Sequence, residues 1–508
     1  MKIVIGLIYM KIYSLKKSTQ LTLMIFIIVL IISYFNYFRN YDYPAGAFWD
    51  ENYYIASAQK YLNHIFFLHE HPPLGHMLIA LGEKIIKANI LSDQFIDLEK
   101  VGEFPKNFSF AGYRLLPVLC AWLTPAIFLL ILLLLTQNYF ISFTLSLLYL
   151  FDNALIVHSR GAMLDAPLML FVCLTILFFL LALRWQRVNF KLILFSIGLG
   201  ISFAFTVTTK YQGGILLLLF PVLYWGIWPH WKKCLYACGF SLGSFYIVFL
   251  LIWQLHFSLG TDINPQLKNK GYFTPKTEYQ IIIADKNHLS PWYLPMMLRI
   301  AFDYTVDVNK GIPPLNLCKK DENGSPAFFW PVGARAINYR WETLDDGQSY
   351  RYLYLQVNPV VWGIGLWGVI ATSGLVLTTL FFPLKESIKN RFLMLTFLGL
   401  YWAYMLIMSR LERVTYLYHY FPALLFSFCL FALWIKEVKR VGAWSFNRRK
   451  KMITLSILAM VVIIAYYFYS PFTYFQPLTD TQFRQRMIFP LWDLRCVKCE
   501  RTSFFKPL

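Results

Sequence analysis

Two adjacent carboxylates, Asp50 and Glu51, follow the first long apolar run of the chain, within the segment 48–54 (FWDENYY). A carboxylate at a membrane surface can act as a general base that takes a proton from a hydroxyl group. Adjacent side chains on a helix diverge by about 100°, so we expect one carboxylate to face a cavity and the other to be held by its neighbours. Solvated loop acids are the alternative when the pair is considered alone.

A histidine-rich turn follows at 69–76 (HEHPPLGH), ahead of an amphipathic stretch at 77–86. Its two prolines predict a rigid turn. The histidines could suggest a zinc site, but the prolines interrupt any helical pairing of His71 with a second ligand. We therefore predict no metal site here and keep His71 as a candidate substrate contact, while any dependence of activity on a divalent metal ion stays open.

Charged side chains within or beside apolar runs form a second group of candidates. Such charges are costly at membrane depth, so a paired or functional role is expected. The fork of donors on Arg114 could hold a phosphate, although the side chain could also snorkel to the interface. Asp152, Arg160 and Asp165 could neutralise one another or contact a substrate. The whole group comprises Arg114, Asp152, Arg160, Asp165, Lys210 and His419.

The composition places these residues in a membrane protein. The 508 residues are 58% hydrophobic and 15% charged, whereas soluble domains are nearer 45–50% apolar and 25% charged. The net charge of +20 could suggest nucleic acid, but the basic residues lie between apolar runs and not on one soluble face, which argues against that partner. A transporter is the rival from another class, yet the sequence shows neither repeat symmetry nor broken midplane helices.

Apolar runs of the length of a membrane span predict about eleven transmembrane helices, although the tight pair of runs around Asp152 to Asp165 could be re-entrant instead. They begin near Leu21, Leu115, Tyr139, Met163, Leu192, Ile215, Leu235, Val360, Phe392, Leu417 and Met452. Basic residues mark alternate connections, above all 436–451, whereas acids are frequent at 39–110. The positive-inside rule then predicts a cytoplasmic N-terminus and an extracytoplasmic C-terminus.

The long connections divide the chain into four expected parts. These are an N-terminal transmembrane catalytic module at 1–257 with an extracytoplasmic loop at 39–110, a second extracytoplasmic loop at 258–358, C-terminal helices at 359–470, and an extracytoplasmic tail at 471–508. Cys496 and Cys499 form one isolated CxxC pair in this tail. A structural zinc site needs a second pair of ligands, so a disulfide or plain thiols are favoured over metal.

Several motifs, in their order along the chain, resemble those of the protein O-mannosyltransferases. They are Asp50-Glu51, His71-Pro72-Pro73-Leu74-Gly75, Asp152-Asn153-Ala154, Ser159-Arg160, Leu164-Asp165, Thr209-Lys210, Trp330-Pro331-Val332-Gly333 and 417–422 (LYHYFP). The resemblance implies an all-α polytopic membrane protein with a GT-C glycosyltransferase fold. It also implies transfer of a hexose, typically mannose, from a polyprenyl-phosphate carrier to Ser or Thr of exported proteins, with inversion. The second loop is too short for the β-trefoil of eukaryotic members, which indicates a prokaryotic-type member.

The resemblance also implies roles by matching position. Asp50 matches the general base, and Glu51 matches a second acidic position that orders the site. Arg114 matches a cation that stabilises the departing lipid phosphate, with Arg160 and Lys210 as weaker candidates for that work. The lipid-linked sugar is a substrate, and no cofactor is implied.

One departure from the family pattern leaves an alternative open. His76 stands where the family motif usually ends in lysine, so a phosphate or structural contact there differs. The rival enzyme is a GT-C transferase that moves a sugar from undecaprenyl phosphate to lipid A or a surface glycan. The His-Pro-Pro-Leu-Gly and Asp-Asn-Ala elements favour the protein-modifying branch. Either enzyme is expected in the inner or plasma membrane, among membrane lipids, with its catalytic face outside the cytoplasm.

Overall fold

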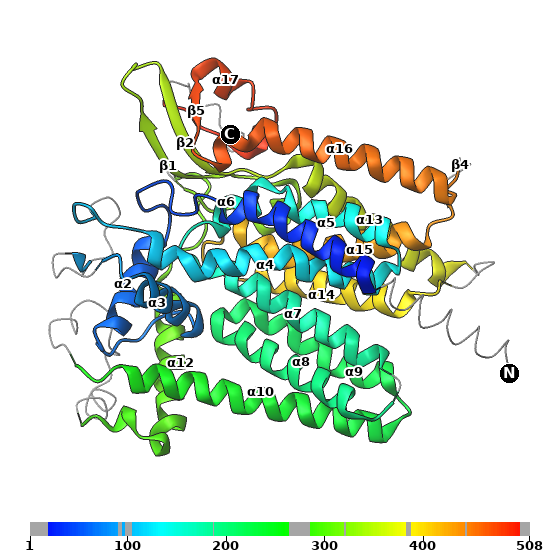
Figure 1. Cartoon of the computed structure of the whole chain (residues 1–508), viewed down its shortest axis with the longest axis horizontal. Helices are drawn as coiled ribbons and strands as arrows, with labels where there is room; N and C mark the ends of the chain where they lie inside the picture. The colour runs from blue at the N-terminus through cyan, green and yellow to red at the C-terminus, as the bar shows by residue number, and fades with distance from the viewer. Residues whose placement is uncertain are drawn as a thin grey trace.

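The computed structural model describes residues 19–89, 94–96, 104–185, 187–263, 285–319, 322–382, 388–441 and 444–497. Within these ranges, nine single helices are long and apolar enough to cross a membrane. They are the first span Thr19–Phe38, α4 (Ala111–Thr136), α7 (Asp165–Arg184), α8 (Phe190–Thr209), α10 (Trp231–Leu259), α13 (Pro359–Phe381), α14 (Arg391–Ser409), α15 (Phe421–Glu437) and α16 (Arg448–Thr473). Figure 1 shows the long helices running roughly side by side.

The other two predicted spans differ from simple crossings. The helices α5 (Tyr139–Leu150) and α6 (Asn153–Ser159) meet at an angle of 57° and count as one broken span or a re-entrant loop. The run Tyr211–Ile227, which ends in α9 (Leu219–Ile227), is apolar but shorter than 18 residues. The described residues therefore contain nine spans, or ten with the bent pair, where the sequence predicted about eleven.

Asp152 fixes the break between α5 and α6. One oxygen of its carboxylate accepts a hydrogen bond of 2.8 Å from the backbone N–H of Leu155 and so caps α6. The other oxygen accepts one of 2.9 Å from the indole N–H of Trp362 in α13. Asp152 is thus held by two helices in the bundle interior.

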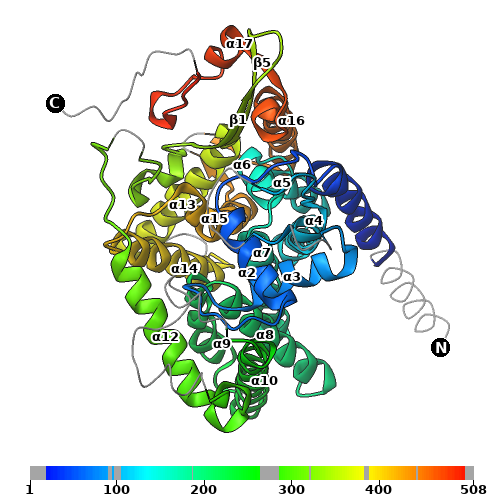
Figure 2. The ribbon, with the colours of Figure 1, turned by 90° about the vertical axis from the view of Figure 1, so that its left-hand side faces the viewer.

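The two long connections gather at one end of the bundle. They supply the helices α2 (Glu51–Leu62), α3 (Leu74–Ile86) and α12 (Leu294–Gly311), which lie together at that end (Figures 1 and 2). The strands β1 (Ile337–Thr343) and β2 (Ser349–Leu355) form an antiparallel hairpin, and β5 (Pro477–Thr479) from the tail pairs with β2. The short helix α17 (Asp480–Arg484) follows. The hairpin of β3 (Arg440–Val441) and β4 (Trp444–Ser445) lies at the opposite end.

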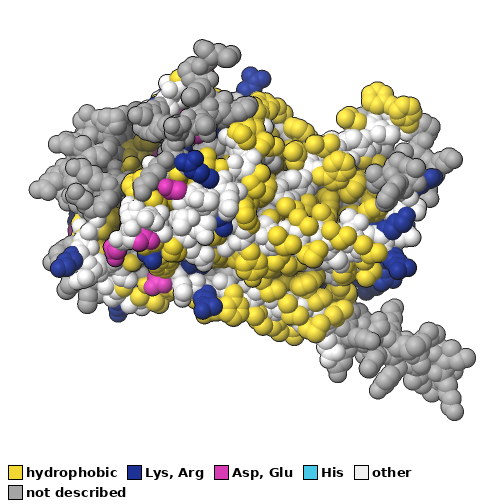
Figure 3. Space-filling model, turned by 90° about the horizontal axis from the view of Figure 1, so that it is seen from above, with side chains coloured by type: hydrophobic (Ala, Val, Ile, Leu, Met, Phe, Trp, Pro, Cys, Tyr) yellow, Lys and Arg dark blue, Asp and Glu magenta, His cyan; other side chains and the backbone are white. Residues whose placement is uncertain are grey.

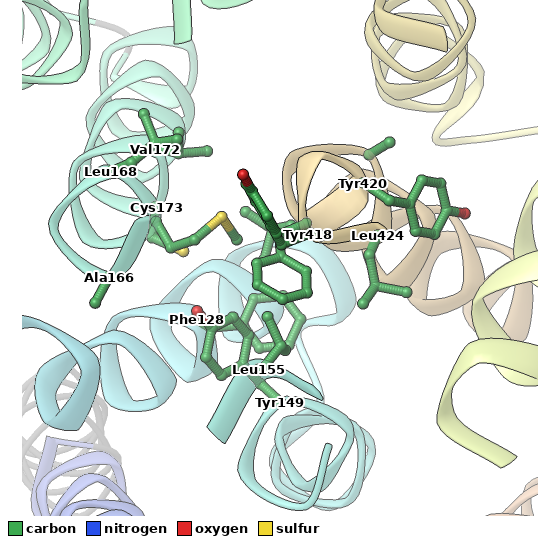
Figure 4. Packing of buried hydrophobic residues seen from close by; sticks show 14 of the residues in the cluster. Phe128, Tyr149, Leu155, Ala166, Leu168, Val172, Cys173, Tyr418, Tyr420 and Leu424 are labelled. Carbon is green, nitrogen blue, oxygen red and sulfur yellow. The ribbon is translucent and has the colours of Figure 1, made fainter. Parts of the chain in front are cut away.

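An apolar band surrounds the middle of the molecule. On the face in Figure 3, hydrophobic side chains separate an end with exposed acids from an end with several Lys and Arg side chains. Ile247 and Leu251 on α10 and Ile464 on α16 are about 60% exposed, as expected for side chains that contact lipid. The chain is thus a multi-pass membrane protein, and a continuous core fills the bundle. Figure 4 shows part of that core, including Phe128 and Tyr418.

In the tail, Cys496 is disulfide-bonded. Cys499 lies outside the described residues.

Candidate active site

Two adjoining cavities open at the end of the bundle that carries α2 and α3. They have volumes of about 220 and 310 Å³ and share the lining residues Glu70, His71, Lys210, Arg413 and His419. The smaller cavity also contains Asp50 and four tyrosines, Tyr53, Tyr54, Tyr416 and Tyr418. Carboxylates, imidazoles and cations thus face one space. Burial lowers the pKa of His71, so its ring is neutral near pH 7 and can hydrogen-bond a sugar hydroxyl.

Asp50 is half-buried and lines the smaller cavity from the N-terminal end of α2. Its neighbour Trp49 has a φ of 54°, a conformation that is uncommon for a bulky residue and that turns the chain sharply into the helix. Burial raises the pKa of Asp50 to about 7, against the opposing charge of Lys210, and nearby Glu70 raises it further. The carboxylate also accepts a hydrogen bond from Tyr418. A carboxylate with this pKa can serve as a general base near neutral pH.

Glu51 points away from the cavity and is completely buried. Its carboxylate receives two hydrogen bonds of 2.7 Å from Arg114, one of 3.1 Å from the N–H of Phe48 and one of 2.7 Å from the N–H of Ala162. The adjacent acids therefore occupy different environments. Through these bonds Glu51 links the segment before α2, the helix α4 and the connection before α7.

Arg114 also lies in this buried network. Two of its donors bond to Glu51, and the other three bond at 2.8 Å to the backbone carbonyls of Asp42, Pro44 and Gly46. Because all five N–H donors of a guanidinium are then engaged, Arg114 holds Glu51 and the segment 42–46, and an anionic ligand would have to displace these bonds.

Arg160 and Asp152 have structural partners as well. The guanidinium of Arg160 donates to the carbonyls of Tyr37, Arg39 and Asn40 and so anchors the chain that leaves the first span. Neither Arg160 nor Asp152 is among the described residues that line the two cavities.

A chain of hydrogen bonds positions Lys210 at the cavity wall. Its ammonium group donates to Asp165 at 2.7 Å, and the imidazole of His158 donates to the same carboxylate oxygen at 2.9 Å. The other ring nitrogen of His158 then accepts a bond of 2.6 Å from the hydroxyl of Tyr339 in β1. The ammonium group also lies 5.3 Å from the ring centre of Tyr418. Asp165 is therefore a positioning residue for Lys210.

The structure adds Glu70 and Tyr339 to the sequence-based candidates. Of the two arginines at one predicted span end, it places Arg413, and not Arg410, among the described residues that line the cavities. Arg413 lines both cavities and donates a hydrogen bond to Asn309 of α12. Its only signal in the sequence is its place near the outer end of a predicted span, a place that Arg410 shares. Glu70 lies inside the histidine-rich motif that was recognised, but the motif gives no reason to select it. Tyr339 carries no chemical signal in the sequence.

The histidine-rich turn packs partly against α2. His76, which replaces the lysine of the family motif, is buried beside Tyr54 and lies with its ring centre 4.2 Å from that of His69. It is not among the described residues that line the two cavities. Among the residues that the structure describes, no group of three or more His, Cys, Asp or Glu side chains could hold a metal ion.

One wall of the larger cavity is apolar. It is built from Ile407 and Met408 at the C-terminal end of α14 and from Leu411 just after that end. Ile407 is 57% exposed and Leu411 is 44% exposed, so this wall continues onto the apolar surface of the bundle. The site can thus take a ligand that has a polar, charged end and a long apolar part.

Comparison with solved structures defines the class of this fold. A chain of the Saccharomyces cerevisiae protein O-mannosyltransferase Pmt1-Pmt2 complex superposes with a TM-score of 0.75 at 14% identity, over 94% of this chain and 93% of that one. ArnT from Cupriavidus metallidurans gives a TM-score of 0.50 at 12% identity, over 90% of this chain and 77% of that one. The predicted fold, that of the polytopic GT-C membrane glycosyltransferases, is confirmed.

Sequence comparison identifies the family within this class. The chain belongs to the family described as dolichyl-phosphate-mannose-protein mannosyltransferase, whose profile matches residues 7–262. A second profile, for the C-terminal four-span region of protein O-mannosyltransferase, matches residues 305–492. The family resemblance seen in the motifs is therefore confirmed.

Curated relatives match over part of their length. Protein O-mannosyl-transferase 1 is 29% identical in Danio rerio and 33% identical in Mus musculus, over 36% and 35% of this chain. Dolichyl-phosphate-mannose–protein mannosyltransferase 4 of Candida albicans is 25% identical over 47% of this chain. The matched segments span 25%, 24% and 33% of these relatives.

Proposed function

We propose that this protein transfers mannose from a polyprenyl-phosphate carrier to Ser or Thr hydroxyls of exported proteins. Family membership supports this reaction, since the curated relatives are named as mannosyltransferases that act on protein. The observation that carries the proposal is the cavity itself, in which the Asp50 carboxylate shares one space with the cations of Lys210 and Arg413.

The proposed step is a direct displacement. Asp50 takes the proton from the acceptor hydroxyl, and the hydroxyl oxygen forms a bond to the anomeric carbon of the sugar from the face opposite the phosphate. The bond between that carbon and the phosphate oxygen breaks, so the configuration inverts. Negative charge then grows on the leaving lipid phosphate, where preformed cations are most effective.

We assign this phosphate role to Lys210 and Arg413 in place of Arg114. Both side chains line the two cavities, whereas the donors of Arg114 are taken by Glu51 and backbone carbonyls. The polyprenyl chain would leave past the apolar wall of α14 and enter the lipid.

We also infer the orientation. Lys436, Lys439, Arg448 and Lys451 lie together at the end opposite the Asp50 cavity. By the positive-inside rule that basic end is cytoplasmic, so the N-terminus is cytoplasmic and the cavity faces outward from the inner or plasma membrane.

Transfer of radiolabelled mannose from polyprenyl phosphate by the purified full-length protein tests the proposal. A Ser/Thr peptide and lipid A are offered in parallel. We expect labelled peptide, and a loss of about 10²–10⁴-fold in Asp50→Asn. The control Asp345→Asn removes an exposed outer acid and should leave transfer unchanged. Labelled lipid A without labelled peptide would establish the alternative acceptor class.

A further inference from the structure

A basic cavity lies at the end of the bundle opposite the Asp50 site. It has a volume of about 460 Å³ and lies where α4 and α15 end and where α5 and α16 begin. Its cationic lining residues are Lys436, Lys439, Arg448 and Lys451. Among the described lining residues there is no Asp or Glu. The cavity is thus suited to an anion.

Two of these cations are fixed in the cavity wall. The ammonium group of Lys436 donates to the carbonyl of Leu135 at 2.9 Å, and that of Lys451 donates to the carbonyl of Lys436 at 3.1 Å. The two accepting carbonyls lie in the last turns of α4 and α15. Since an ammonium group has three donors, each lysine can still bond a ligand. The adjacent acid, Glu437, accepts a hydrogen bond from Asn390 and is not among the described lining residues.

The cavity adjoins the lipid-facing surface of α16. Met452 lines the cavity and is 39% exposed. Ile453 directly follows Met452, and Ile457 and Met460 lie one and two helical turns after Ile453, in the direction of the apolar band. These three side chains are 50%, 51% and 56% exposed. An anionic headgroup in the cavity would therefore have an apolar track directly beside it, which a free inorganic anion would not use.

We propose that this cavity binds the phosphate headgroup of an anionic phospholipid, whose acyl chains lie along α16. Each Lys or Arg near a membrane surface contributes about 1 kcal/mol to the attraction of anionic lipid, and four such side chains converge here. The proposal does not depend on the transfer reaction, because the site shares no residue with the Asp50 cavity.

Native mass spectrometry of the full-length protein in neutral detergent tests this site, with phosphatidylglycerol and phosphatidylcholine titrated separately. We expect at least tenfold tighter binding of phosphatidylglycerol. The double variant Lys439→Gln/Arg448→Gln should lose about thirtyfold of that affinity. The matched control Arg449→Gln/Lys450→Gln removes the same charge from the first turn of α16, outside the cavity lining, and should lose less than twofold.

Three results would overturn the proposal. Equal binding of the two lipids would show that the cavity does not select an anion. Equal losses in the two double variants would show that diffuse surface charge, and not the cavity, attracts the lipid. Displacement of phosphatidylglycerol by millimolar inorganic phosphate would identify a free-anion site. Melting temperatures measured in the same detergent would show whether each variant is folded.

Discussion

At the scale of single residues, the neighbours Asp50 and Glu51 have different surroundings, since Asp50 lines a cavity and Glu51 is fully buried. Glu51 is buried in an ion pair with Arg114, and removal of one partner from such a pair typically costs about 3–5 kcal/mol. We therefore expect Glu51→Ala to lower the melting temperature of the purified protein sharply. Asp50→Asn should leave that temperature nearly unchanged while it slows transfer by about 10²–10⁴-fold. A fully stable Glu51→Ala protein would contradict the structural role.

The protonation of Asp50 gives a second prediction. A base with a pKa of about 7 is increasingly protonated below that pH, so kcat/KM for transfer should fall as the pH drops through about 7. The negative charge of Glu70 raises the pKa of Asp50. Glu70→Gln should therefore move the acidic limb of the pH profile to lower pH. If the acidic limb of the kcat/KM profile moved to higher pH, or did not move, the proposed coupling between the two carboxylates would be contradicted.

The residues of the site were predictable to the extent that they lie in local motifs. Asp50, His71 and Lys210 stand in recognisable segments, and all three line the cavity. The function of Arg114 could not be read in the same way, because its partners are backbone carbonyls 68 to 72 positions earlier in the chain. Arg410 and Arg413 both stand at the end of the same predicted span, and the sequence offers no reason to prefer Arg413, because an arginine there has the same appearance whether it faces lipid headgroups or a cavity.

At the scale of elements, β1 reaches the site through Tyr339. Its hydroxyl holds His158, which holds Asp165 and thereby Lys210. Tyr339→Phe removes one hydrogen bond, worth about 1 kcal/mol, and keeps the ring contact with Phe48. We expect about a fivefold loss of kcat in the transfer assay, with little change in melting temperature. The control Tyr246→Phe alters an exposed residue of α10. An equal loss of kcat in that variant would contradict the role of the Tyr339 hydroxyl.

The contact between α3 and α4 depends on small residues. A Cβ atom at Gly82 would overlap the carbonyl oxygen of Gly112 in the first turn of α4. Gly82→Ala should therefore force α3 away from α4 and destabilise the protein by about 1–3 kcal/mol. Gly243→Ala is the matched control, since a Cβ there meets no atom within 4 Å. In thermal unfolding in detergent, the midpoint temperature should fall for Gly82→Ala and stay unchanged for Gly243→Ala.

The spans were predictable because length and hydropathy are local properties, and nine of them are single helices. The sheet was not predicted. The strands β1 and β2 are neighbours in sequence, but β5 lies more than 120 residues after β2. No local sequence pattern predicts the pairing of β5 with β2. A re-entrant segment near Asp152 was foreseen as an alternative to two simple crossings, but the bonds that fix the break could not be predicted, since they come from Asn358 and Trp362, more than 200 positions later in the chain.

At the scale of the whole molecule, the tail after α16 supplies the third strand of the sheet formed by β1 and β2. Leu478 of β5 is 3% exposed and pairs with Tyr350 of β2. We expect Leu478→Ala to cost about 2–4 kcal/mol locally and to increase the rate of hydrogen exchange in β2. The exposed neighbour Gln476 provides the control, Gln476→Ala, which should leave exchange unaffected. Equal exchange in the two variants would mean that the tail does not support the sheet.

The pairing of β5 with β2 also bears on the order of assembly during synthesis. Tyr339 and Tyr350 belong to strands that are made before α13, yet the third strand of their sheet follows α16. The sheet can be completed only after every intervening helix has been made and the tail has returned to the end of the bundle that carries β2. A nascent chain that already contains Asp50, Lys210 and Arg413 would thus still lack the strand that completes the sheet from which Tyr339 holds His158.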